Sequence, residues 1–388
     1  MAASLTAPQI AVVKATAPVL KEHGTTITTL FYRNMIDAHP ELHDYFNMTD
    51  QITGAQPRAL AAAVFAYATY VDDLAQLTAL VERIAHKHAS LGIKPEHYPI
   101  VGKFLLEAWT AAYACLADIF INREQQLYAA FENWTGWRRF KIQRKEVEST
   151  EITSFYLVPE DGGALPLYLP GQYISLRMFI SQLKHWQPRQ YSLSDAPSTD
   201  YYRISVKREK GKEIGLPGLI SNKLHEEYKE GDVVELTHPT GEFFVDLEDK
   251  TPLVLISAGV GITPMISILN SVVATGSSRQ VSLIHGAHSS EARAFGEHIK
   301  EACNSPNIDA TVFLTTTHAQ EVQGVDYHME GRMRLELVSP ASLHLGDTTA
   351  HYYVCGPCAF MKDIRNYLLA SGISEARIHL EVFDVGNE

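Results

Sequence analysis

The sequence has few cysteines, no surplus of basic residues and no long hydrophobic run. Four cysteines in 388 residues, Cys115, Cys303, Cys355 and Cys358, are too few for a disulfide scaffold. The net charge of −12 argues against a nucleic acid or an anionic membrane as the main partner, because such surfaces attract Lys and Arg patches. The longest uncharged apolar run near the N-terminus is Ala59–Val71, shorter than the roughly 20 residues that a membrane span needs.

The first residues, MAASLTAPQI, have neither the basic start nor the apolar block of a secretory signal. Hydrophobic content of 46% and charged content of 20% are those of a soluble globular protein. A chain of this length is too long for one ordinary core, which predicts two or three domains. We therefore expect a cytoplasmic monomer without an integral membrane span, acting on small molecules.

Residues 1–135 show helical periodicity and no strand-like alternation, which predicts an all-α domain. Gly24 is expected to end the first helix, and Pro40 to stop the next one. Two histidines follow in one helical pattern, where His86 falls roughly 200° from His88 because each residue turns about 100°. His88 recurs with the apolar side chains, so we expect it to face the core and His86 to face water.

Taken singly, the polar residues of this domain have ordinary explanations. His88 fits a core histidine bonded to backbone, and Tyr32 a buried tyrosine with a bonded hydroxyl. Gln56 fits a capping or surface glutamine, and Tyr98 and Glu124 fit surface positions. Their order along the chain is more informative than any one of them.

The series FY…PEL-x-x-x-FNM…Q-x-x-x-L…KHASLGIKPEHYPIVG…INRE closely resembles the haem domain of the flavohaemoglobins. The resemblance implies a globin fold that binds haem b. The positions it implies are His88 for the proximal iron ligand, Tyr32, Gln56 and Leu60 for the distal pocket, Phe46 for packing on the haem, Lys87 for tuning its potential, and Tyr98 and Glu124 for the hydrogen-bonded pair beside His88. Such a pair would orient the imidazole and raise its basicity.

One stretch departs from the family pattern. Between Gly102 and Ala117 the family usually has a longer segment, and roughly four turns of helix are missing here. We therefore expect a globin domain that is shortened near residues 106–112. Tyr98 and Glu124 lie on either side of this stretch.

Strand-like alternation replaces the helical period over residues 136–250, and Gly and Pro separate the short segments, which predicts a small antiparallel β-barrel. Its central motif is Arg189-Gln190-Tyr191-Ser192. An arginine can neutralise a diphosphate, a tyrosine ring can lie against a flavin, and a serine can bond its polar edge. By itself the motif also fits an ordinary exposed strand.

PGQY before this motif and VKRE and GLISN after it complete an ordered set that resembles the FAD domain of the ferredoxin–NADP reductase superfamily. In that resemblance the GLISN loop and helix start would cradle the pyrophosphate. The implied FAD-binding residues are Tyr173, Arg189, Gln190, Tyr191, Ser192, Lys207, Gly218, Ser221 and Asn222.

Residues 251–388 alternate strand and helix, which predicts a doubly wound α/β domain with a parallel sheet. The turn GVGITP lets backbone approach a dinucleotide's phosphates, although tight strand–helix turns need glycine for other reasons too. With a later CGP it resembles the superfamily's NAD(P)H site, and the segment EVF resembles one that reaches back over the flavin. The implied residues are Gly259, Val260, Gly261, Ile262, Thr263, Pro264, Cys355, Gly356, Pro357, Glu381, Val382 and Phe383.

Two details of this last domain need separate treatment. Cys355-Gly356-Pro357-Cys358 also spells a thioredoxin-type redox motif, but that motif expects a small domain of its own with a preceding tryptophan. We expect Cys355 to border the nicotinamide instead. The family's Gly-Pro after the EVF segment is replaced by Asp384-Val385.

The resemblance covers nearly the whole chain and implies a nitric oxide dioxygenase, in which electrons from NADH or NADPH pass through FAD to haem and nitric oxide and O₂ become nitrate. Two alternatives remain open at this point. One is an oxygen-binding or sensing globin with its own reductase. The other is an NAD(P)H diaphorase or ferric reductase whose shortened globin has lost its haem. Arg293 lies where a 2′-phosphate could be read, but the sequence does not decide between NADH and NADPH.

Overall fold

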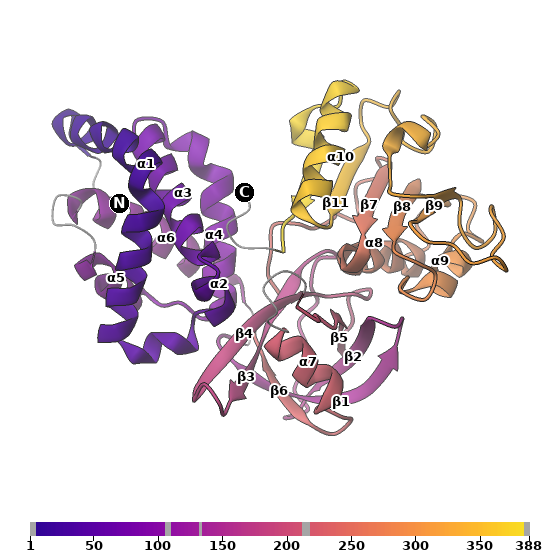
Figure 1. Cartoon of the computed structure of the whole chain (residues 1–388), viewed down its shortest axis with the longest axis horizontal. Helices are drawn as coiled ribbons and strands as arrows, with labels where there is room; N and C mark the ends of the chain where they lie inside the picture. Colours follow the sequence, from indigo (N-terminus) through magenta and orange to yellow (C-terminus); the bar gives the residue numbers. More distant parts are fainter. Residues whose placement is uncertain (1–4, 105–109, 132–133, 212–217, 384–388) are drawn as a thin grey trace.

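The computed structural model describes residues 5–104, 110–131, 134–211 and 218–383, without the side chains of 110–119. A helical part, an antiparallel sheet and a parallel sheet follow one another along the chain. In Figure 1 the indigo and purple helices stand at the left, the pink antiparallel strands lie lower down, and the orange and yellow parallel sheet is at the upper right. This arrangement confirms the expected fold class.

The described helices of the first part are α1 (Ala7–Ala38), α2 (Met48–Ile52), α3 (Ala55–Tyr70), α4 (Thr78–Leu91), α5 (Tyr98–Phe104) and α6 (Thr110–Ala130). The helix end expected at Gly24 is wrong, because α1 continues through it. A Cβ added at Gly24 would lie 3.2 Å from the Cβ of Ala61, so this glycine allows α1 and α3 to approach closely. The stop before Pro40 is as predicted, with His39 capping the helix end.

The antiparallel sheet contains β1 (Arg138–Val147), β2 (Ile152–Pro159), β3 (Tyr173–Ile180), β4 (His185–Ser192), β5 (Tyr202–Lys207) and β6 (Val233–Leu236). Their order is β4-β3-β6-β1-β2-β5. A bridge between Leu193 and Ile204 brings the chain after β4 onto β5, which joins the two edges of the sheet. Apolar side chains such as Phe140, Leu176 and Leu236 fill the interior, so the predicted barrel is confirmed.

The parallel sheet contains β7 (Leu253–Ala258), β8 (Val281–Ala287), β9 (Ile308–Leu314), β10 (Met329–Glu330), β11 (His351–Cys355) and β12 (Ile378–Glu381), in the order β10-β9-β8-β7-β11-β12. The helices that follow β5 are α7 (Leu219–Glu226), α8 (Ile262–Ala274), α9 (Gly296–Ala302) and α10 (Cys358–Ala370). One core forms with α8 and α9, and a second with α10. Both faces of the sheet are therefore covered, as parallel sheets require.

Within the described ranges, no helix combines the length and the apolar character that crossing a bilayer would need.

Candidate functional site

One cavity of about 570 Å³ lies where the globin helices, the barrel and the end of β12 meet. The predicted site residues that line it are Tyr32, Phe46, Gln56, Leu60, Lys87, His88, Tyr98, Tyr173, Arg189, Gln190, Tyr191, Ser192, Lys207, Gly218, Ser221, Val260, Thr263, Glu381, Val382 and Phe383. Residues expected at a haem and residues expected at a flavin therefore face one continuous space.

His88 is held by the pair that the sequence indicated. Its Nδ1 lies 2.8 Å from Glu124 Oε1 and 3.1 Å from the Tyr98 hydroxyl, which itself donates to Glu124 at 2.6 Å. Glu124 on α6 is only 2% exposed. With Nδ1 engaged, Nε2 is the ring nitrogen left for a ligand in the cavity. The pairing spans the stretch that the sequence predicts to be shortened, of which residues 105–109 lie outside the described residues.

This donor set fits a haem iron. Among the described residues there is no cluster of three or more His, Cys, Asp or Glu that could hold a metal ion. A haem iron needs one protein ligand, which His88 would supply, because the macrocycle provides the others. An imidazole whose second nitrogen is bonded to a carboxylate is the usual form of such a ligand.

Across the cavity, Tyr32 is buried and accepts a hydrogen bond from the Gln56 amide at 3.2 Å. Burial raises the pKa of Tyr32 to about 12, so its hydroxyl stays protonated near neutral pH. The ring of Phe46 packs edge-on against that of Tyr32, with centroids 5.4 Å apart. The predicted distal residues thus form one hydrogen-bonded and packed group.

Tyr173 on β3 and Arg189–Ser192 on β4, here called the flavin platform, line the barrel side of the cavity. The two strands pair with Tyr173 opposite Ser192, so these two side chains share one face of the sheet. Burial raises the pKa of Tyr191 and of Tyr173, which keeps both rings neutral. Ser192 Oγ is buried with no hydrogen-bond partner in the described part of the protein, and a flavin's polar edge would satisfy it.

Asn222 does not reach the cavity. Its amide nitrogen donates to the carbonyls of Glu209 and Gly218, both at 2.8 Å, so it braces the loop from inside. Ser221, one residue earlier on α7, does line the cavity. Lys207 also lines it and lies 3.6 Å from Glu151.

The turn after β7 is built on two glycines. Gly259 has a φ of +56°, which favours glycine. A Cβ at Gly261 would lie 2.3 Å from the Cys355 carbonyl oxygen, so only glycine lets this turn pack against the end of β11. Val260 and Thr263 line the cavity. The predicted residues that shape this corner without lining the cavity are Gly259, Gly261, Ile262, Pro264, Cys355, Gly356 and Pro357.

The two cysteines of the CGPC sequence give no support to a redox function. Cys355 is fully buried, and burial raises the pKa of its thiol well above the ordinary value. A reactive cysteine needs the opposite shift. Cys358 begins α10, and no disulfide joins the two, both of which the structure describes.

Glu381 at the end of β12 lines the cavity. Burial, and then the charge of Glu242, raise the pKa of Glu381 to about 8. Val382 and Phe383 line the cavity beside it. Asp384 and Val385, where the sequence departs from the family, lie outside the described residues.

The expectation that His86 faces water is wrong. His86 is 9% exposed, and its Nδ1 lies 2.6 Å from Thr240 Oγ1 and accepts from the Gly241 N–H at 3.1 Å. His86 is buried because the barrel packs against this part of α4, whereas Arg83 and Glu82 on the same side stay partly exposed. Sequence reasoning missed Ser90 as well, which bonds to the flavin platform, because its partners are far along the chain.

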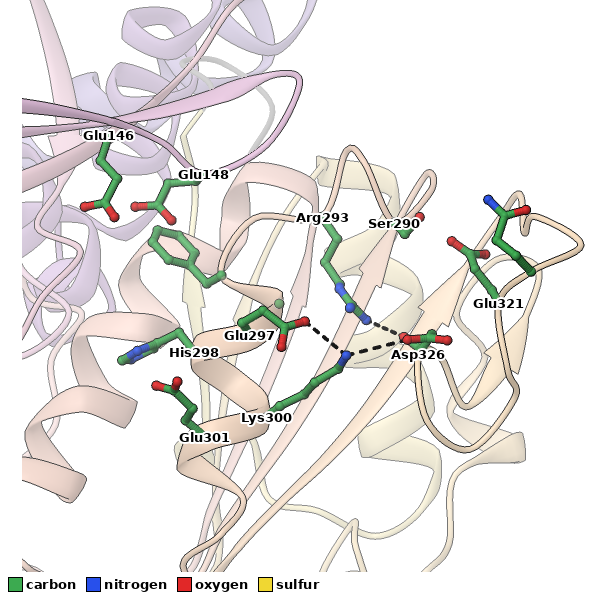
Figure 2. A pocket seen from close by; sticks show the side chains of 13 residues that line it. Glu146, Glu148, Ser290, Arg293, Glu297, His298, Lys300, Glu301, Glu321 and Asp326 are labelled. Atoms are coloured by element: carbon green, nitrogen blue, oxygen red, sulfur yellow. Dashed lines mark hydrogen bonds and ion pairs between the residues drawn. The ribbon is translucent and has the colours of Figure 1, made fainter.

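A second cavity of about 630 Å³ lies between the β1–β2 hairpin and α9 (Figure 2). Arg293 is the residue that the sequence placed where the 2′-phosphate of NADPH could bind. Its guanidinium donates to the Asp326 carbonyl at 2.5 Å. Lys300 pairs with Glu297 and Asp326. Carboxylates dominate the lining, so Arg293 lies in surroundings that disfavour a 2′-phosphate.

Two family models match parts of the chain. Residues 29–119 match the globin family, and residues 255–366 match the oxidoreductase NAD-binding domain. A flavohemoprotein of Bordetella pertussis is 48% identical over an alignment covering 97% of this chain and 98% of that protein. A flavohemoprotein of Rhizobium meliloti is 45% identical, with 96% of each chain covered.

Two solved structures are similar. A flavohemoglobin from Malassezia yamatoensis with bound FAD and heme has a TM-score of 0.84 and 28% identity, and 98% of this chain and 100% of that one are covered. The FAD/NAD-binding domain of a nitric oxide dioxygenase from Vibrio cholerae has a TM-score of 0.56 and 40% identity, with 63% and 98% covered. The fold and the site together define a globin fused to a two-domain reductase that binds FAD and NAD. The chain belongs to the flavohemoprotein family.

Proposed function

We propose that the protein is an NAD(P)H-dependent nitric oxide dioxygenase that converts nitric oxide and O₂ to nitrate, with electrons passing through FAD to haem b. The continuous cavity between His88 and the flavin platform carries the proposal, because it joins an iron site to a reductase in one chain. When bound, FAD divides the electron pair of a hydride, and haem offers the iron at which the two gases react. The protein's own residues bind, orient and hold protons.

On the proximal side, Glu124 fixes the His88 ring. Its carboxylate accepts from Nδ1–H and from the Tyr98 hydroxyl, which sets one tautomer and leaves Nε2 as the nitrogen that would bind a haem iron. A charge-assisted hydrogen bond of this kind makes the imidazole a stronger electron donor. We assign Tyr98 and Glu124 this role, and His88 that of the iron ligand.

On the distal side, Tyr32 is the hydrogen-bond donor. The Gln56 amide occupies an acceptor position of its hydroxyl oxygen, which leaves the hydroxyl proton for a substrate oxygen in the cavity. Leu60 and Phe46 line the same region and keep it apolar. A donor in a water-poor pocket favours the developing anionic charge of the product.

In the reductase, Val260 and Thr263 approach the flavin platform from the end of β7, where a nicotinamide would lie against the flavin. Arg189 and the start of α7 face the place of the flavin's phosphates. Glu381, with its raised pKa, can hold a proton between the two cofactors near neutral pH.

We also propose a cytoplasmic monomer that acts without nucleic acid. The net charge of −12 and the small number of cysteines support the absence of nucleic acid and the reducing compartment. Light scattering after size exclusion tests the monomer, since a mass near 43.2 kDa is expected.

Spectra and turnover of the purified protein test the function. Flavin and Soret bands are expected together, and steady NADH or NADPH consumption should require both O₂ and nitric oxide and yield nitrate. Turnover indifferent to nitric oxide would favour the oxygen-binding globin. A flavin band without a Soret band would leave only the reductase.

A further inference from the structure

Helix α4 presents two functional faces. His88 faces the cavity, and His86, roughly 200° round the helix, faces the barrel, as does Ser90 one turn later. The helix stands on the side of the globin that faces the reductase (Figure 1). Both His86 and Ser90 are buried although they lie outside the haem side of the helix.

The contact of His86 requires one tautomer. A backbone N–H can only donate, so Nδ1 must be the acceptor for Gly241 at 3.1 Å. The proton then resides on Nε2, which lies 3.9 Å from the Glu82 carboxylate, and Arg123 holds that carboxylate at 2.9 Å. The Thr240 hydroxyl, 2.6 Å from Nδ1, completes the contact.

Thr240 and Gly241 lie directly behind the flavin platform. Thr240 exchanges two backbone hydrogen bonds with Tyr173, each 2.9 Å long. A Cβ at Gly241 would lie 3.0 Å from the ring of Tyr173. His86 is therefore linked to Tyr173 of the flavin platform through Thr240 and Gly241.

Ser90 makes a second, independent contact. Its hydroxyl donates to the Lys87 carbonyl at 2.8 Å and accepts from Gln190 Nε2 at 2.9 Å and from the Ser175 hydroxyl at 3.1 Å. Gln190 belongs to the flavin platform, and Ser175 lies on the same strand as Tyr173. Two contacts on one face of α4 thus fasten the helix of His88 to the strands of the platform.

We propose that His86 is a positioning residue that fastens the haem-bearing helix to the flavin-binding barrel and thereby sets the speed of electron transfer from flavin to haem. The inference rests on the proposed function, since it takes haem at His88 and flavin at the platform. Electron tunnelling falls steeply with distance, so a small displacement of α4 from the barrel lowers the transfer rate. Hydride transfer to the flavin involves neither α4 nor His86 and is unaffected.

Two variants of the full holoprotein test this role. His86→Leu removes the acceptor, whereas His86→Asn places an amide oxygen close to where Nδ1 stood. Hydrogen exchange is read on the backbone amides of residues 237–243. With the acceptor lost, the Gly241 amide should exchange about tenfold faster in His86→Leu, and the Asn variant should restore the protection. Flavin and haem content check that both variants fold.

Anaerobic stopped-flow then separates the two electron steps. Flavin bleaching by NADH should keep its wild-type rate in both variants. Haem reduction should slow by about tenfold in His86→Leu and recover in His86→Asn. Unchanged Gly241 exchange, or faster exchange with haem reduction at the wild-type rate, would overturn the proposal. A wild-type protein that lacks a Soret band or nitric oxide turnover would instead refute the proposed function, while the exchange result would still report the contact.

Discussion

Replacing Glu124 by glutamine changes the proximal side of the site at a single carboxylate. The carboxylate is 2% exposed and accepts at 2.8 Å from His88 and at 2.6 Å from Tyr98. Glutamine keeps the shape and removes the charge. His88 then becomes a weaker electron donor, so the ferrous state of a bound haem is favoured.

The size of the effect follows from the strength of the lost interaction. A hydrogen bond to a buried charged group contributes about 1.5–3 kcal/mol. For a one-electron couple, about 1.4 kcal/mol corresponds to about 59 mV, so the haem midpoint potential should rise by about 60–130 mV. Tyr98→Phe, which keeps the carboxylate, should give a smaller rise of about 40 mV.

Spectroelectrochemical titration of the Soret band measures this shift, and the flavin bands in the same sample are an internal reference. Glu96→Gln, an exposed carboxylate close in sequence to Tyr98, is the matched control and should leave the potential unchanged. A Glu124→Gln potential equal to or below that of the wild type would refute the assignment of Glu124 as the acceptor for His88.

Three further changes give distinct readouts. Tyr32→Phe should speed O₂ dissociation in flash photolysis by about tenfold or more, because a charge-assisted hydrogen bond is lost, whereas exposed Tyr70→Phe should not. Gly261→Ala should slow flavin reduction by NADH about tenfold, because the new Cβ would lie 2.3 Å from the Cys355 oxygen; Gly346→Ala, which meets no atom within 4 Å, is its control. Glu381 has its pKa raised from 4.5 to about 8, so its contribution to stability is present below pH 4.5 and is lost as pH rises to about 8. The free energy of unfolding, measured with urea at several pH values, should not show this loss in Glu381→Gln. If it changed with pH equally in the two proteins, the raised pKa of Glu381 would be contradicted.

Much of the fold was predictable because its signals are local. Strand alternation and Gly or Pro punctuation predicted the strands of the barrel, and the apolar run before the Gly259–Pro264 turn predicted β7. Gly24 was misread because a glycine that ends a helix and a glycine that admits a neighbouring helix look alike in sequence. The short strand β10 carries too few residues to show a period.

The sequence predicted which residues belong to the site better than it predicted their hydrogen bonds. The order of motifs placed Tyr32, His88 and the flavin platform together, and the cavity contains them all. Asn222 was expected beside a ligand but braces its own loop, since an amide that directly follows a serine at a helix start can serve either purpose. Ser192 Oγ shows the converse case, a buried atom whose partner the protein does not supply.

The sequence by itself determined which helix carries the candidate iron ligand and which of its two histidines faces the apolar side. It could not determine what covers the other side. His86 lies on a charged helix face, and helical periodicity predicts that such a face is exposed to solvent. Only the tertiary structure places Thr240 and Gly241 there, because the side-chain contact joins residues 154 positions apart. Local patterns report how a helix divides polar from apolar, but the docking of another domain decides which polar side chains become buried.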